Sequence, residues 1–545
     1  MPTITGGGSF TGGVTVILPS ATGRVPTPAN VVNAWDLDYA QPESNTSLAW
    51  NVTTGMFLQT YNLGSDTGDT GIRGLVIGNN GTKLYATANG NDRIWEWDLS
   101  KAYDISSASY VQEFNTNAYE TNNRGLTFKP DGSRMYTIGY QNDDVTEYEL
   151  SDSWNVASAS YVTEFGVATQ EANPEAVEFK PDGTKMYITG TSGDDINEYD
   201  LSTAWDISTA TYSQTSSSMS GTETAPRGMA FKPDGTSVWV VGINSDTVDR
   251  YNFSTPWDVS TMSYGNEDLY LTDALNPESI WFKSDGTNFY TITSGLAAQY
   301  VVGVKRFDVK NDESTPQDVF LKPDGTKMYI IGQNGDEINE YDLSVAFEVE
   351  TASLLQTQSL SAYDGTPTGF YFKSDGTTFW MVGSTGDDVN EFSLSTPWDI
   401  TSLTYEQNFS LAGQDTVPEG IHFKTDGTKM YMAGSTNDNI YEYDLSTAWD
   451  ISTATYSQSI SSQGNPTAVW FKPDGTKMFQ LGRSTNQDAL HEYALSSAWD
   501  ISSATLSKSL SVPENTPSGV WFPSNGERMY LVGSANDMVI QYEFT

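Results

Sequence analysis

A short pattern of apolar and polar positions repeats along most of the chain. In its clearest copy, one apolar run ends at Phe179, Lys-Pro-Asp-Gly follows, and a second apolar run covers Met186 to Ile188. Apolar runs on either side of a Pro-Asp-Gly turn predict two strands joined in a hairpin, with the glycine at a positive φ. Met186 and Ile188 point to one face and Tyr187 to the other, so this strand must be covered on both faces.

Two further strands complete the repeating unit. A third strand ends in Tyr-Asp-Leu at Leu201, and a fourth follows the turn Trp205-Asp-Ile-Ser. The turn glycine recurs about every 51 residues, except for one shorter interval of 39 residues, at Gly81, Gly132, Gly183, Gly235, Gly286, Gly325, Gly376, Gly427, Gly475 and Gly526. A fixed period in this range indicates a solenoid, a propeller or an array.

Four strands per repeat, without helical periodicity, predict an all-β protein whose ten repeats are the blades of a β-propeller. A β-solenoid is the alternative, although its coils are usually shorter. The Phe179-Lys-Pro-Asp-Gly core resembles WD40-like and TolB-type propeller repeats over residues 56–545. The longer unit, with Gly193-Asp-Asp and Ser202-Thr-Ala-Trp-Asp-Ile-Ser, resembles repeats in virion proteins of marine tailed bacteriophages, and bacterial surface proteins carry similar arrays.

The grouping of the blades into rings depends on one defect in the repeat. The tryptophan of the third turn has no counterpart between Trp257 and Phe347, so blade five lacks a fourth strand, whereas an orphan strand, Met56–Leu63, precedes blade one. If this strand completes blade five, the chain forms two five-bladed rings; if it completes blade ten, the chain forms one ten-bladed ring. The position of the defect at the midpoint favours two rings.

The predicted domains follow from the two-ring interpretation. Residues 1–50 form an N-terminal attachment arm, residues 51–309 the first propeller and residues 310–545 the second. Blade ten is then short of a strand, for which Val14–Leu18 is a candidate. An outer edge left unpaired would expose backbone N–H and C=O groups, so a closing strand is expected in each ring.

Charge and composition restrict the function. Lys and Arg number 27 and Asp and Glu 70, so the net charge is −43, and such a surface repels nucleic acid and anionic lipid. The chain has no Cys and only two histidines, His422 and His491, which argues against a catalytic triad or a site with several His ligands. Neither a membrane-spanning stretch nor a standard signal peptide is expected.

Acidic pairs in the loop between the second and third strands are candidate Ca²⁺ ligands because Ca²⁺ prefers carboxylate oxygens. The alternative is that these residues cap turns and keep the surface soluble. The candidates are Asp143, Asp144, Asp194, Asp195, Asp387 and Asp388. Apart from this possible Ca²⁺, no cofactor is expected.

The loop that leads into each inner strand should surround the mouth of an axial channel. In the first half its variable residue is often charged, at Arg73, Arg124, Glu175, Arg227 and Glu278. These charges could hold a ligand or pair with one another. In the second half an inner column is mostly aromatic and could stack on sugars or fill the axis, at Phe320, Tyr371, His422, Trp470 and Trp521.

No copy of the repeat combines an acid, a base and a nucleophile, so a protein without enzymatic activity is predicted. Together with the phage-like resemblance, this favours a bacteriophage structural protein of the tail or capsid, located in the virion. Its residues 1–50 would bind other virion proteins, and its propellers would support assembly or bind a host-surface glycan or receptor. A bacterial surface adhesin is the second hypothesis. A propeller lactonase or lyase is the third, and it requires convergent acidic and His ligands in one channel, where the inner column offers only Glu178.

Overall fold

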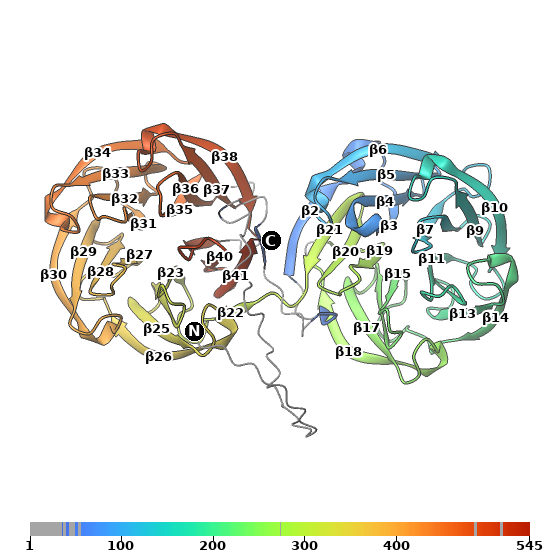
Figure 1. Cartoon of the computed structure of the whole chain (residues 1–545). Helices are drawn as coiled ribbons and strands as arrows, with labels where there is room; N and C mark the ends of the chain where they lie inside the picture. Colours follow the sequence, from blue (N-terminus) through green and yellow to red (C-terminus); the bar gives the residue numbers. More distant parts are fainter. Residues whose placement is uncertain are drawn as a thin grey trace, which may run out of the picture.

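The chain folds into two rings of radial β-sheets. The computed structural model describes residues 35, 40–42, 49–52, 56–272, 274–483, 488–512 and 516–544. Within these residues there are ten antiparallel sheets, each extending from an inner strand near the ring axis to an outer strand at the perimeter (Figure 1). The all-β propeller expected from the repeat is confirmed.

The first ring contains five sheets. Blade one is β3 (Ile72–Gly78), β4 (Lys83–Ala88), β5 (Arg93–Leu99) and β6 (Ala108–Asn115). Blade two is β7 (Asn123–Phe128), β8 (Arg134–Gly139), β9 (Asp144–Leu150) and β10 (Ala159–Gly166). Blade three is β11 (Pro174–Phe179), β12 (Lys185–Gly190), β13 (Ile196–Leu201) and β14 (Ala210–Thr215). Blade four is β15 (Pro226–Phe231), β16 (Ser237–Gly242), β17 (Thr247–Phe253) and β18 (Met262–Tyr270). Blade five is β19 (Ser279–Phe282), β20 (Asn288–Thr293), β21 (Leu296–Val301) and β2 (Met56–Asn62).

The second ring repeats this plan. Blade six is β23 (Pro316–Leu321), β24 (Lys327–Gly332), β25 (Glu337–Leu343) and β26 (Ala352–Ser359). Blade seven is β27 (Pro367–Phe372), β28 (Thr378–Gly383), β29 (Asp388–Leu394) and β30 (Leu403–Ser410). Blade eight is β31 (Pro418–Phe423), β32 (Lys429–Gly434), β33 (Asn439–Leu445) and β34 (Ala454–Ser461). Blade nine is β35 (Asn465–Phe471), β36 (Lys477–Arg483), β37 (Ala489–Leu495) and β38 (Ala504–Ser511). Blade ten is β39 (Pro517–Trp521), β40 (Arg528–Gly533) and β41 (Met538–Phe544), with β1 (Ala40–Pro42) and β22 (Arg306–Asp308) paired to β41.

Short helical turns link the strands. A five-residue helix, α1 (Leu63–Thr67), joins β2 to blade one. Before most outer strands there is a 3₁₀ turn whose preceding Asp or Asn accepts a hydrogen bond from a backbone N–H two residues later, as Asp206 does from Ser208 at 3.1 Å. These turns are η5 (Ile105–Ser107), η6 (Val156–Ser158), η7 (Ile207–Thr209), η8 (Val259–Thr261), η10 (Ile400–Ser402), η11 (Ile451–Thr453) and η12 (Ile501–Ser503). The turn η9 (Val349–Thr351) follows Glu348, which makes no such bond, and η4 (Asn79–Gly81) lies between β3 and β4. Within the described chain, no helix is both long and apolar enough to cross a membrane.

The first ring closes through the N-terminal strand, as the two-ring interpretation predicted. β2 pairs antiparallel with β21, with Phe57 opposite Tyr300, and not with β41. The third strand of blade five, β21, begins at Leu296, directly after a turn in which Gly295 has a φ of 86°. Trp50 occupies the position of the missing tryptophan and stacks on Phe282 at 5.1 Å between ring centroids.

The second ring is closed by two separate segments. Ala40–Pro42 pairs with one half of β41 and Arg306–Asp308 with the other half. Val14–Leu18, the predicted closing strand, lies outside the described residues. Residues 40–42 belong to the predicted arm and residues 306–308 to the range predicted for the first propeller, yet both contact blade ten. Trp35 also contacts this blade: its backbone N–H donates a hydrogen bond to the backbone carbonyl of Gly526 at 3.3 Å.

Hydrogen bonds between consecutive blades hold each ring together. The hydroxyl of an inner tyrosine donates to the backbone carbonyl of the aromatic residue of the next blade, as Tyr85 does to Trp154 at 2.5 Å. The same bond joins the last blade of each ring to the first: Tyr290 donates to Tyr103 O at 2.6 Å, and Tyr530 donates to Phe347 O at 2.8 Å. Among the described residues, the bond occurs at four junctions of the first ring and three of the second, whereas Trp239, Trp380 and Phe479 replace the tyrosine in the remaining blades. Repetition of this bond at most junctions helps the sequence repeat to specify a closed ring.

Candidate functional site

Five charged side chains meet at the mouth of the axial channel of the first ring. Arg73 and Glu278 form an ion pair, as do Arg227 and Glu175, although these residues come from four different blades. Arg124 approaches Glu175 with 3.7 Å between Nε and Oε2. Three guanidinium groups therefore face two carboxylates, and this mouth is locally cationic in a chain whose net charge is −43.

The arginines are packed closely enough to affect one another. Burial, followed by repulsion from Arg124 and Arg227, lowers the pKa of Arg73 to about 10, so it remains charged at neutral pH. The Nε atoms of all three arginines are buried and make no hydrogen bond. Arg124 has the weakest carboxylate partner and lies over the Tyr140 ring at 5.4 Å. Unpaired N–H donors and an excess of positive charge favour an anionic ligand.

Glu178 lies below the mouth and lines the same small cavity, whose volume is about 20 Å³. It is three residues beyond Glu175 on β11, which places it about 10 Å deeper along the strand. Burial raises the pKa of Glu178 to about 8, and the Thr127 hydroxyl, at 3.4 Å, opposes part of this rise. Glu178 is therefore mostly protonated at neutral pH and can donate a proton.

The second ring has a different mouth. The corresponding residues are Gln317, Thr368, Glu419, Thr467 and Ser518, and several of them bind the backbone of the adjacent blade. The Thr368 hydroxyl donates to Pro418 O at 2.6 Å and the Ser518 hydroxyl donates to Pro316 O at 2.8 Å. These hydroxyls act as links between blades, so this mouth offers fewer free donors to a ligand than the first.

The aromatic column of the second ring forms a closed circle around the axis. Successive ring centroids are 4.5 to 6.0 Å apart around the sequence Phe320, Tyr371, His422, Trp470, Trp521 and back to Phe320. Phe320, His422 and Trp521 are buried, with relative exposures of 5%, 3% and 3%. The structure thus brings all five predicted residues together, and their rings contact each other across the axis.

The predicted calcium ligands fall into three separate blades. Asp143, Asp194 and Asp387 have φ values of 53°, 49° and 51°, so the first member of each pair occupies a left-handed turn position. In the second and third pairs the other member binds asparagine side chains: Asp195 accepts from Asn197 at 3.0 Å and Asp388 from Asn390 at 2.6 Å. No group of three or more acidic or histidine side chains suited to a metal occurs among the described residues.

One buried acid, Asp318, was not among the site residues predicted from the sequence. Asp318 occupies a β23 position where the other blades have glycine or alanine, such as Gly369 and Ala468, or serine in blade five, Ser279. It lies in the axial channel of the second ring, and burial raises its pKa to about 8. Alignment of the repeats at this column would have revealed the substitution, because a carboxylate replaces a residue that is otherwise small.

Fold and channel define a protein of two tandem β-propellers. A lactonase family, described as a 7-bladed β-propeller, matches residues 75–256, which lie in the first ring. A solved structure described as a candidate 6-phosphogluconolactonase from Bacteroides fragilis is 13% identical, with coverage of 76% of this chain and 98% of that chain and a TM-score of 0.26. No curated protein matches the sequence.

The lactonase match contradicts two predictions made from the sequence. It points to a lactonase and not to a bacteriophage structural protein, and so to an enzyme and not to a protein without activity. No single repeat combines an acid, a base and a nucleophile, which is why a protein without activity was predicted. In the folded ring, chemically different residues from separate blades converge on one channel, so a site can be distributed over repeats that each look structural.

Proposed function

We propose that the first propeller hydrolyses small anionic lactones at the mouth of its axial channel. The observation that carries this proposal is the convergence of three guanidinium groups above a protonated carboxyl, Glu178. Glu178, Arg124 and Arg227 lie within residues 75–256, which match a lactonase family. The enclosed cavity itself has room for about one water molecule, so the lactone binds at the open mouth above it.

The chemistry can be assigned to named side chains. A lactone carbonyl beside Arg124 would develop negative charge on its oxygen as water attacks, and the guanidinium would stabilise that charge. Glu278, whose Oε2 makes no hydrogen bond, accepts the proton of the attacking water. The C–O bond of the lactone ring then breaks, and Glu178 supplies a proton to the leaving oxygen through the water that the cavity below the mouth can hold. The product is a hydroxy acid, whose carboxylate the remaining arginines attract.

The test is a hydrolysis assay on sugar-acid lactones with and without a phosphate or carboxylate group. We expect anionic lactones to be preferred, and Arg124→Met to lower kcat/KM by about 10²- to 10³-fold, the loss typical of an oxyanion donor. Arg93→Met is the control, because Arg93 pairs with Glu113 at the outer strand of blade one and lies away from the channel.

Glu178→Gln tests the acid role separately. Since the pKa of Glu178 is about 8, the rate should fall as pH rises past about 8, and the Gln variant should lose this alkaline limb along with most of its activity. Wild-type protein that binds lactones or their hydroxy acids without turnover would refute the hydrolase proposal, and so would a rate that Arg124→Met leaves unchanged.

A further inference from the structure

Blade two contains a buried group of oxygen atoms without hydrogen-bond partners. Although Glu120 weakly contacts Asp144, and Tyr148 weakly contacts Thr137 and Thr146, nine buried side-chain oxygens among the described residues of this blade and its entering loop make no hydrogen bond of ordinary geometry. They are Glu120 Oε1 and Oε2, Asn122 Oδ1, Asn123 Oδ1, Thr137 Oγ1, Asp143 Oδ1, Asp144 Oδ1, Thr146 Oγ1 and Tyr148 Oη. A buried polar atom without a partner destabilises the fold, so such a concentration calls for a partner.

The geometry of the sheet makes these side chains converge. Asp144, Thr146 and Tyr148 alternate along β9 and therefore share one face. Thr137 on β8 lies directly opposite Thr146, and Gly139 lies opposite Asp144. The Glu120 carboxylate packs directly on Gly139, where a Cβ atom would collide with it. Because Gly139 pairs with Asp144, the Glu120 carboxylate lies next to the Asp144 position of β9.

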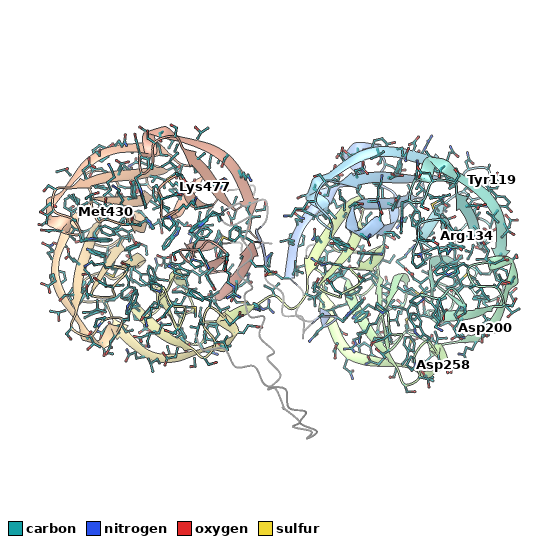
Figure 2. The ribbon with its side chains drawn as sticks, in the orientation of Figure 1. Tyr119, Arg134, Asp200, Asp258, Met430 and Lys477 are labelled. Carbon is teal, nitrogen blue, oxygen red and sulfur yellow. The ribbon has the colours of Figure 1, made fainter. Side chains whose placement is uncertain are left out.

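The surroundings seal this group from solvent. Glu120 is 1% exposed, and Thr137, Thr146 and Tyr148 are fully buried. The ring of Tyr119, labelled at the perimeter of the first ring in Figure 2, packs against Tyr148 with 6.2 Å between centroids. Water can reach these oxygens only by local opening, so an occupant would be retained.

In blades three and seven, the backbone satisfies the equivalent acid, whereas Asp69 in blade one and Glu313 in blade six each keep one oxygen without a partner. Glu171 in blade three accepts N–H bonds from Asn173 at 2.8 Å and Ser192 at 3.0 Å. Asp364 in blade seven does the same with Thr366 at 2.7 Å. In blade two the N–H groups of the corresponding loop approach Glu120 without reaching hydrogen-bond geometry, so its carboxylate oxygens are left for another partner.

We propose that this blade-two cage, formed by Glu120, Asp144, Thr137, Thr146 and Tyr148, binds a Ca²⁺ ion. Two carboxylates balance the charge of a divalent cation, and the hydroxyl oxygens complete an all-oxygen environment of the type Ca²⁺ prefers. Without the ion, Glu120 and Asp144 repel each other, and burial together with this repulsion raises the pKa of Glu120 to about 8. A proton shared by the pair, or a buried water, is then the competing occupant.

Calorimetric titration of the full chain with CaCl₂ tests the proposal, with NaCl at matched ionic strength as the comparison. We expect one saturable site with a heat that NaCl does not reproduce. Glu120→Gln should weaken the affinity by at least about tenfold, the loss reported even for partners that only support metal ligands. Glu120→Gln should fold, because glutamine mimics the protonated acid.

Glu171→Gln is the matched control, since it changes the equivalent acid of blade three, and the calcium response should persist in it. Thr146→Val provides a second test that leaves both carboxylates in place and should also weaken binding. The proposal is overturned if no saturable heat is seen, which would leave a proton or water in the cage, or if Glu120→Gln and Glu171→Gln bind Ca²⁺ equally well.

Discussion

Asp318 should make the stability of the second propeller fall as pH rises. Its carboxylate accepts N–H bonds from Val319 at 2.8 Å and Phe370 at 3.1 Å, but no cation pairs with it among the described residues. It is 8% exposed and lies among the apolar residues of the axial channel, including Phe320. Burial disfavours the ionised form more than two backbone N–H groups can offset, so the acid prefers to keep its proton.

The magnitude follows from the pKa. A rise in the pKa from 3.8 to about 8 corresponds to about 6 kcal/mol between the two protonation states. Because the folded-state pKa lies above the unfolded one, the folded state binds the proton more tightly. The contribution of protonated Asp318 to the free energy of unfolding is fully present below about pH 4, decreases as pH rises, and is lost above about pH 8.

Asp318→Asn removes the titration and keeps an oxygen that can accept one of the two N–H bonds. We expect the variant to be less sensitive to pH than the wild type, with a stability difference in its favour that grows by up to about 5 kcal/mol between pH 4 and pH 8. Urea unfolding at several pH values, followed by tryptophan fluorescence, measures this difference. The two propellers can unfold separately, so the later and earlier transitions must be fitted individually.

Glu406→Gln is the control, because Glu406 is exposed on β30 and its removal changes the total charge by the same amount. A difference between Asp318→Asn and wild type that stays constant across this pH range would refute the reasoning. A control variant with the same pH trend as Asp318→Asn would refute it as well, since the effect would then come from overall charge.

Three further predictions concern the repeat and its closure. Gly183→Ala should destabilise the protein by about 1–3 kcal/mol or more, because Gly183 has φ 72° beneath Trp205, whereas Gly221→Ala, in open space, should be nearly neutral in the same thermal unfolding experiment. Trp50→Ala should cost about 3–5 kcal/mol and speed proteolysis near residues 50–62, since the stack on Phe282 closes the first ring; unchanged cleavage would contradict this role. His422→Phe should stabilise the second ring more at pH 5 than at pH 8. Burial lowers the pKa of His422 to about 3, so at pH 5 the unfolded state binds a proton that the folded state does not. An equal stabilisation at both pH values would contradict this prediction.

Much of the fold could be predicted because local sequence encodes each blade. The Pro-Asp-Gly turn requires a positive φ at its glycine, and the structure gives Gly183 and its counterparts such values. Strands that are apolar on both faces predicted sheets stacked on one another. Because one outer strand was missing in blade five, the pairing of Met56–Asn62 with that blade could also be predicted. Blade ten was harder, since three-residue strands such as Ala40–Pro42 carry no hydrophobic pattern.

The sequence by itself determined the blade, its turns and its number of copies, because these depend on contacts within about fifty residues. It also indicated where the first ring closes, because the missing outer strand of blade five and the extra strand Met56–Asn62 complement each other, although they lie far apart in the chain. Only the tertiary structure decided which residues from different blades meet. Arg73 and Glu278 are far apart in sequence but form an ion pair. Glu120 and Asp144 lie close together in the buried interior of blade two, which their spacing in the sequence does not predict. Ring closure brings distant loops to one axis, so the environment of each charged group, and with it the chemistry, is set by the complete ring.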